Sequence, residues 1–127
     1  MVCLIPYLGC ECQTIVISLK NGAFLHQSES QGIYQKAGKV NIKTSWISSS
    51  NNNALWYNEV ANDWIIGPVD YLGSSTGGIS SAGGQGRSSC PYTVSKDAWV
   101  YVGNSAWIIA DANDVSVECL TGKLLVT

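Results

Sequence analysis

Apolar side chains along the chain occur in short runs rich in β-branched and aromatic residues, separated by Gly, Asn and Ser. Such runs, bounded by turn-forming residues, predict β-strands. The predicted strands cover residues 14–19, 32–36, 40–46, 54–58, 63–67, 98–102, 106–110 and 115–119. Nowhere do apolar residues recur at helical spacing over about 11 residues. The pattern therefore predicts an all-β fold, a compact antiparallel domain resembling a sandwich or barrel.

One segment interrupts this pattern. Residues 73–89 are almost entirely Gly, Ser, Ala and Thr, a composition also found in linkers. The 72 residues before this segment and the 38 after it would each form a weak core. We therefore expect a long surface loop within one domain.

The pattern Trp-x7-Trp-Ile-Ile occurs twice, beginning at Trp56 and at Trp99. Two similar hairpins are predicted. With odd-numbered loops, Trp56 would face Trp64 across one hairpin and Trp99 would face Trp107 across the other. The simpler interpretation is that all five tryptophans, Trp46 included, are core residues.

Charged residues make up only 13% of the chain and apolar residues 46%, with a formal net charge of −2. No basic surface is available for a nucleic acid backbone. No apolar run approaches the roughly 20 residues that span a bilayer. Nucleic acid partners and a membrane span are therefore not expected.

The chain has five cysteines and one histidine, and no Cys-x-x-Cys pair; the closest cysteines are Cys10 and Cys12. This pattern favours disulfides over zinc, and hence an oxidising, extracellular location. Two intrachain bridges would leave one cysteine over.

The sequence offers little for catalysis. His26 is the single histidine, and no Gly-x-Ser-x-Gly motif accompanies it. Paired carboxylates among Asp63, Asp70, Asp111 and Asp114 are better interpreted as turn residues. The protein is not expected to be an enzyme.

Calcium is the one cofactor for which the sequence offers candidate ligands. Asp111, Asn113 and Asp114 supply oxygen ligands in close succession, but the segment lacks the glycine and distant glutamate of an EF-hand. We otherwise expect no metal or cofactor.

Residues 12–119 resemble a secreted domain of extracellular proteins from aquatic eukaryotes, where it is often repeated in tandem. The blocks that carry the resemblance are Tyr34 with residues 36–41, residues 54–57, 63–68, 72–74 and 78–81, Cys90-Pro91, Trp99, and residues 113–119. The resemblance implies a bridge between Cys90 and Cys119, the recurrent pair of the pattern. It leaves the partners of Cys3, Cys10 and Cys12 open.

Two apolar extensions depart from the pattern, residues 1–11 before the domain and residues 120–127 after it. More loosely, the chain resembles a subunit of extracellular protein fibrils found in environmental water. We expect a structural protein whose exchanged terminal strand completes a neighbour's sheet, head to tail, giving a homopolymeric filament. The N-terminal extension, in particular residues 1–8, is favoured over the C-terminal one as the donor strand. The expected assembly residues are Val2, Leu4, Ile5, Tyr7, Leu8, Leu120, Leu124 and Val126.

The alternative function is carbohydrate binding or adhesion. Exposed aromatic rings such as Trp46, Tyr57 or Tyr71 would stack on sugars beside residues 51–53, which are all asparagine. Exposure of these rings would favour this alternative, and burial of the tryptophans would disfavour it.

Overall fold

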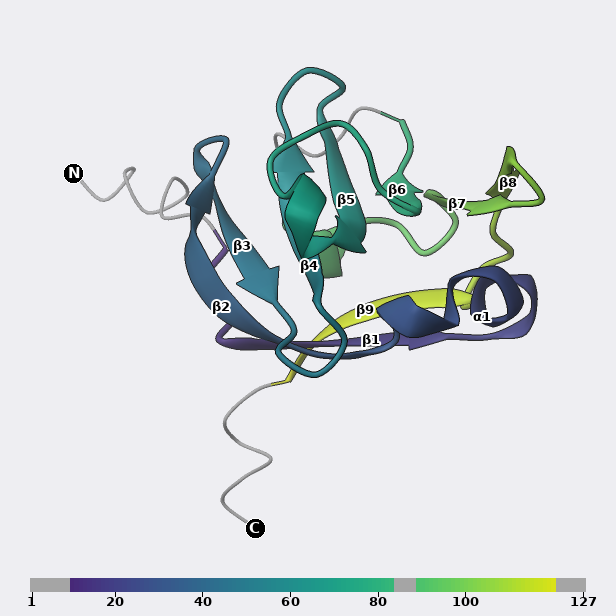
Figure 1. The fold of residues 1–127 in the computed structure, drawn as a ribbon, viewed down its shortest axis with the longest axis horizontal. Coiled ribbons are helices and arrows are strands. Elements are labelled where there is room, and N and C mark those ends of the chain that lie inside the picture. Colours follow the sequence, from purple (N-terminus) through teal and green to yellow (C-terminus); the bar gives the residue numbers. More distant parts are fainter. Residues whose placement is uncertain (1–9, 84–88, 121–127) are drawn as a thin grey trace, which may run out of the picture.

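Nine antiparallel strands form one sheet in this computed structural model, which describes residues 10–83 and 89–120 (Figure 1). The spatial order of the strands is β8-β7-β6-β5-β4-β3-β2-β1-β9. The strands are β1 (Thr14–Leu19), β2 (Gly32–Val40), β3 (Lys43–Ile47), β4 (Asn53–Asn58), β5 (Asp63–Pro68), β6 (Ile79–Ser81), β7 (Trp99–Gly103), β8 (Ala106–Ile109) and β9 (Val115–Leu120). The helical elements are α1 (Asn21–Gln27) and the 3₁₀ turns η2 (Ser28–Ser30), η3 (Val69–Tyr71) and η5 (Pro91–Thr93).

The predicted all-β fold is confirmed, and each of the eight predicted strands has a counterpart in the sheet. Two elements were not predicted. Strand β6 lies inside the predicted surface loop, where it pairs with both β5 and β7 and buries Ile79 completely. Helix α1 has only seven residues, too few to show a helical period.

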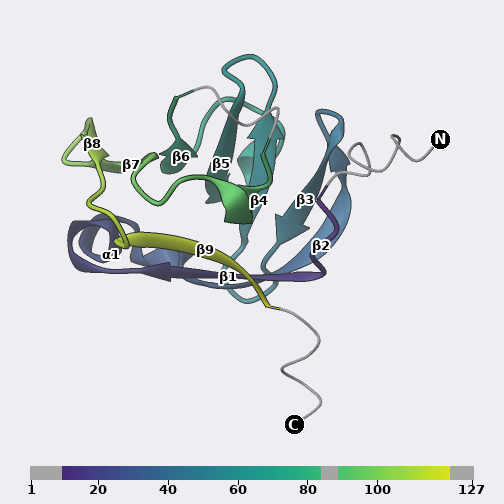
Figure 2. The same cartoon turned by 180° about the vertical axis from the view of Figure 1, so that it is seen from behind.

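The sheet curls until β1, β2 and β9 lie across β4, β5, β6 and β7, as the two opposite views show (Figures 1 and 2). The main core fills the space between these two layers. Its buried side chains include Ile15 and Ile17 from β1, Trp64 from β5, Trp99 from β7 and Val117 from β9. Residues alternate between the two faces of a strand, so the next residue on each strand points away from this core.

A smaller apolar cluster covers the outer face of β4 and β5. Ala54, Trp56 and Ile65 are buried there under Val69 and Leu72. The Trp56 indole N–H donates to the carbonyl of Ser74 at 2.8 Å, which holds the segment after η3 against the sheet. A Cβ on Gly67 would lie 2.8 Å from the Cα of Gly77, so backbone meets backbone here.

The predicted tryptophan pairs are wrong, because both hairpin loops have an even number of residues. Asn58 pairs with Asp63, which leaves a four-residue loop and places Trp56 opposite Ile65 rather than Trp64. Gly103 pairs with Ala106, which leaves a two-residue loop and places Trp107 opposite Val102. The tryptophans of each predicted pair therefore lie on opposite faces of the sheet.

Four of the five tryptophans are buried, as the simpler interpretation expected; Trp107 is the exception, with 55% of its surface exposed. Of the predicted strand-like termini, residues 1–9 and 121–127 lie outside the described residues. Within the part of the chain that the structure describes, no helix is long and apolar enough to cross a membrane.

Candidate assembly surface

The sheet has two edge strands, β9 and β8. An edge strand presents unpaired backbone N–H and C=O groups that another chain can pair with, unless something covers or blocks them. The two edges of this sheet differ in that respect.

Strand β9 faces other parts of its own chain. Val115, Val117 and Glu118 line a hollow of about 140 Å³, and Tyr92 and Val94 line it from the segment that follows Cys90. Ligand pockets usually measure about 300–1,000 Å³, so this hollow is small for an organic ligand. The edge of β9 is thus flanked by the 92–99 segment and carries a charge at Glu118.

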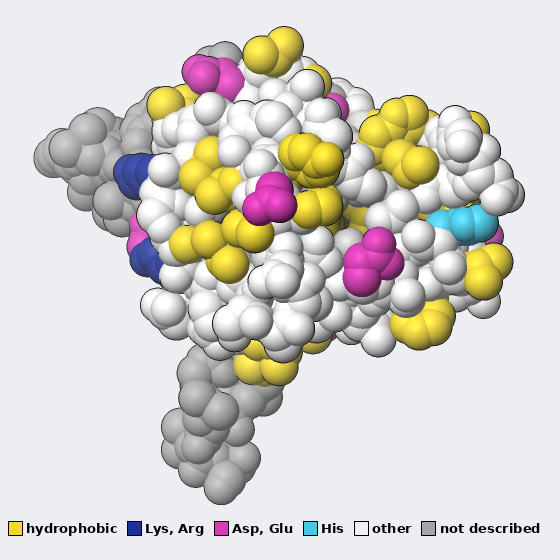
Figure 3. All heavy atoms as spheres, viewed as in Figure 1, with side chains coloured by type: hydrophobic (Ala, Val, Ile, Leu, Met, Phe, Trp, Pro, Cys, Tyr) yellow, Lys and Arg dark blue, Asp and Glu magenta, His cyan; other side chains and the backbone are white. Residues whose placement is uncertain are grey.

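Strand β8 carries no charge of its own, and no described strand pairs with its outer edge. No charged residue or proline occurs from Trp99 to Ala110, the whole length of the β7–β8 hairpin. Ile109 is 77% exposed and Trp107 is 55% exposed. Apolar side chains are visible at the surface over this end of the molecule (Figure 3). Exposed apolar edge strands without charge or proline are prone to pair with other strands.

The register defines one apolar surface on this hairpin. Val100 lies opposite Ile109, and Val102 lies opposite Trp107. Because opposite residues share a face, these four side chains all point away from the main core. We call Val100, Val102, Trp107 and Ile109 the outer face of the hairpin.

The hydrogen-bond pattern of the hairpin follows from its turn. Asn104 and Ser105 both have positive φ, 53° and 67°, as in the two-residue turns that suit β-hairpins. The residues flanking such a turn, Gly103 and Ala106, form a hydrogen-bonded pair, and such pairs then alternate along the ladder. The bond from the Ala110 N–H to the Trp99 carbonyl, 3.0 Å, fits this alternation.

Trp107 and Ile109 therefore occupy the positions whose backbone N–H and C=O point away from β7. Among the described residues, none provides a hydrogen-bond partner for these groups. On the inner side of the hairpin the corresponding groups are paired. The Val102 N–H donates to the Gly78 carbonyl at 2.9 Å, and the Val102 carbonyl accepts from the Gln27 side chain at 2.7 Å.

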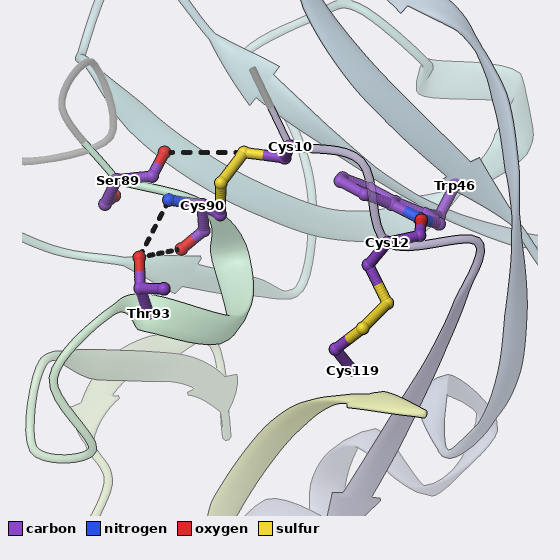
Figure 4. The surroundings of a disulfide bond; sticks show 7 residues. All are labelled: Cys10, Cys12, Trp46, Ser89, Cys90, Thr93 and Cys119. Atoms are coloured by element: carbon purple, nitrogen blue, oxygen red, sulfur yellow. Dashed lines mark hydrogen bonds between the residues drawn. A yellow bond between two sulfur atoms is a disulfide. The ribbon is translucent and has the colours of Figure 1, made fainter. Parts of the chain in front are cut away.

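Two disulfides fix the start of the domain. Cys10 bonds to Cys90 and Cys12 bonds to Cys119 (Figure 4). Cys12 is further held by its carbonyl, which accepts from the buried Trp46 indole N–H at 2.7 Å. Two disulfides are typical of proteins from oxidising compartments.

The expected bridge between Cys90 and Cys119 is wrong. Strand β1 pairs with β9 so that Ile15 lies opposite Cys119, which brings Cys12 to within a Cα–Cα distance of 5.9 Å of Cys119. Cys90 instead reaches Cys10, with a Cα–Cα distance of 5.5 Å. Cys3 lies outside the described residues.

Both ends of the described chain lie at one end of the β1–β9 ladder. Thr14 pairs with Leu120 at that end, and Leu19 pairs with Val115 at the other. Helix α1 follows β1 at this second end and packs against β7. The turn of the β7–β8 hairpin therefore lies toward this second end, and the six-residue ladder itself is about 17 Å long (Figure 1).

The structure places three of the predicted assembly and extension residues. Leu120 belongs to β9, Cys10 is buried in the main core, and the Glu11 carboxylate lies 3.0 Å from the Lys36 ammonium. Val2, Leu4, Ile5, Tyr7, Leu8, Leu124 and Val126 lie outside the described residues. The outer face of the hairpin was not predicted, although the sequence shows the uncharged run from Trp99 to Ala110.

The predicted sugar-stacking residues are not brought together. Trp46 and Tyr57 are buried, so their faces are unavailable and this part of the prediction is wrong. Tyr71 is half exposed. The asparagine segment beside them is structural: the Asn53 side chain donates to the Glu29 carbonyl, and that of Asn51 donates to the Gln31 carbonyl.

The candidate calcium ligands form a turn. The Asp114 N–H donates to the Asp111 carbonyl at 3.0 Å, and Asn113 adopts a positive φ of 77°. One carboxylate oxygen of Asp114 accepts from the Asn21 side chain at 2.9 Å. No cluster of three or more His, Cys, Asp or Glu side chains suited to a metal occurs in the described ranges.

Comparison of the chain with protein-family models, with curated proteins and with solved structures gave no match in any of the three.

Proposed function

We propose that the protein is an extracellular structural subunit that assembles head to tail into a filament, each copy contributing a terminal strand to the sheet of the next. The observation that carries this proposal is the placement of two features at opposite ends of the domain. The chain enters at Cys10 and leaves at Leu120 at one end, and the open β8 edge lies toward the other. A head-to-tail contact between two different surfaces propagates into a filament when its rotation does not close a ring.

The disulfides support a structural role. Tension applied to residues 1–9 or 121–127 would enter the domain at Cys10 or near Cys119. Each bridge passes that tension to a distant part of the chain, 80 and 107 residues away in sequence. The two disulfides therefore lie where tension along a strand-exchanged filament would enter each domain.

The described residues supply 18 buried side chains to the main core, from Cys10 to Val117. In the proposed filament, the apolar residues of the extensions contact a neighbouring copy. Low charge favours such contacts, because few charges must be desolvated.

Deletion of each extension tests the proposal. Variants lacking residues 1–9 or residues 121–127 keep all four bridged cysteines and should fold as oxidised monomers. Negative-stain microscopy should show filaments for the full chain and none for the variant without its donor strand. Filaments from both deletion variants would contradict the proposal.

Carbohydrate binding is the second candidate, and the half-exposed Tyr71 is the observation that favours it. The substitution Tyr71→Ala should then abolish binding on a glycan array without altering assembly. A glycan array without hits removes this candidate.

A further inference from the structure

We propose that β8 is the acceptor edge, onto which an extended terminal segment of a second copy adds as a tenth strand. This inference rests on the proposed function and names the surface that the donor strand contacts. Strand addition at a sheet edge combines backbone hydrogen bonds with side-chain contacts at alternate positions. Strand β8 meets both requirements.

The backbone requirement is met at Trp107 and Ile109. These residues present two N–H and two C=O groups toward the open side of the sheet, spaced two residues apart as in an antiparallel ladder. Ile108, which lies between them, and Ala110, which follows Ile109, direct their groups toward β7. An added strand can therefore form its bonds without breaking any bond within the hairpin.

The side-chain requirement is met by the outer face. Its four apolar side chains form two cross-strand pairs, and β8 contributes the outermost two. A strand added beside β8 would place every second side chain next to Trp107 and Ile109. Aromatic and β-branched neighbours of this kind stabilise the pairing of adjacent strands.

The two extensions have a matching pattern. Val2 and Leu4 are apolar residues two positions apart, as are Leu124 and Val126. In a strand, residues two positions apart lie on the same face. Either extension can therefore set two apolar side chains against the outer face.

A copy is poorly placed to fill its own β8 edge. The length of the β1–β9 ladder, about 17 Å, must be crossed first, and at about 3.4 Å per residue this takes roughly five residues. Only about four of residues 1–9, or two of residues 121–127, would remain for pairing. A second copy can present its extension from outside without this loss.

The test combines an edge variant with a matched control. Ile109→Lys places a charge on the open edge, and Val60→Lys places the same charge on the exposed β4–β5 turn, where 94% of Val60 is accessible. We expect Ile109→Lys to remain monomeric in analytical ultracentrifugation and Val60→Lys to form filaments like the unmodified chain. Ile109→Pro is a second edge variant, since it removes only an N–H that points away from β7.

Mixing two variants that do not assemble alone tests whether the terminal extension of one binds the β8 edge of the other. Ile109→Lys retains its donor extension but has a blocked edge, whereas the non-assembling deletion variant retains a free β8 edge and has no donor. We expect neither to assemble alone and a 1:1 heterodimer when they are mixed. Isotopic labelling of the deletion variant should then show that resonances of Trp107 and Ile109 shift.

The outcomes separate this inference from the proposed function. Filaments from Ile109→Lys and Ile109→Pro, with none from a terminal deletion, would overturn the acceptor assignment and leave strand exchange standing. A full chain that never assembles would contradict both. A closed dimer that persists after both deletions and is lost in Ile109→Lys would indicate pairing of β8 with β8, and would also overturn the assignment.

Discussion

Trp107 lies directly opposite Val102 across the β7–β8 ladder, with both side chains on the outer face of the hairpin and away from the main core. It is the exposed tryptophan of this chain, since the other four are buried. The same strand position leaves its backbone groups without partners among the described residues. Trp107 therefore reports directly on whether the β8 edge is covered.

Fluorescence quenching uses this exposure. In the monomeric Ile109→Lys variant, iodide should quench a fraction of the tryptophan emission, and the further substitution Trp107→Phe should remove that fraction. In filaments of the unmodified chain Trp107 should be protected, because the added strand covers it. Equal iodide quenching of monomer and filament would count against coverage of this residue.

The long disulfides should contribute strongly to stability. Replacing both Cys12 and Cys119 by Ala opens a loop that spans 107 residues. We expect the free energy of unfolding to fall by about 2–5 kcal/mol, chiefly because the unfolded chain regains conformational freedom. Urea titration of the double variant and the parent measures this, and peptide mapping under non-reducing conditions checks the pairing. A Cys90–Cys119 peptide in the parent would contradict the pairing described above.

Alkaline pH should destabilise the domain through Tyr34. Burial raises the pKa of this phenol well above its ordinary value, the charge of Glu29 raises the pKa further, and the Asn51 side chain opposes both. The hydroxyl donates to the Ser30 carbonyl at 2.6 Å. The fold favours the neutral form, so stability is fully present below about pH 10, the ordinary pKa of tyrosine, and is lost as the pH rises further.

Urea unfolding between pH 8 and pH 11 tests this dependence. Tyr34→Phe should be less stable at pH 8 by about 1–3 kcal/mol, because the Ser30 carbonyl loses its donor. It should also lose less stability between pH 9 and pH 11 than the parent. Parallel curves for the two proteins would show that Tyr34 does not set the alkaline limit.

The segment over β5 requires glycine at position 77. A Cβ there would lie 2.9 Å from the Ile66 carbonyl oxygen and would also meet the Ile65 side chain. We expect Gly77→Ala to lower the free energy of unfolding by about 1–3 kcal/mol through overpacking. Gly38→Ala is the control, because no atom lies within 4 Å of its Cβ position, and its effect should be small. Equal effects of the two substitutions would show that the close approach costs nothing.

Local sequence patterns predicted most strands because alternation and turn residues act within a few positions. They missed β6 because its three residues lie in a Gly- and Ser-rich segment and become a strand only between β5 and β7. The cysteine pairing was missed for a related reason. It depends on the register of β1 against β9, which joins residues about 100 positions apart.

The candidate site was only partly predictable. The apolar composition of the extensions predicted that they take part in assembly. The open edge was not predictable in this way, because it depends on which strand lies at the end of the sheet. The loop lengths also mattered, since one residue more in the 104–105 turn would have exchanged the faces of Trp107 and Ile108. A sequence pattern does not fix either property.

Amide hydrogen exchange tests the central claim most directly, because it reads the backbone groups that the added strand would bind. In the monomer, the amides of Trp107 and Ile109 should exchange rapidly, while that of Ile108, bonded to Tyr101, should be protected. In the filament all three should be protected. Unchanged rapid exchange at Trp107 and Ile109 in the filament would contradict the assignment of β8 as the acceptor edge.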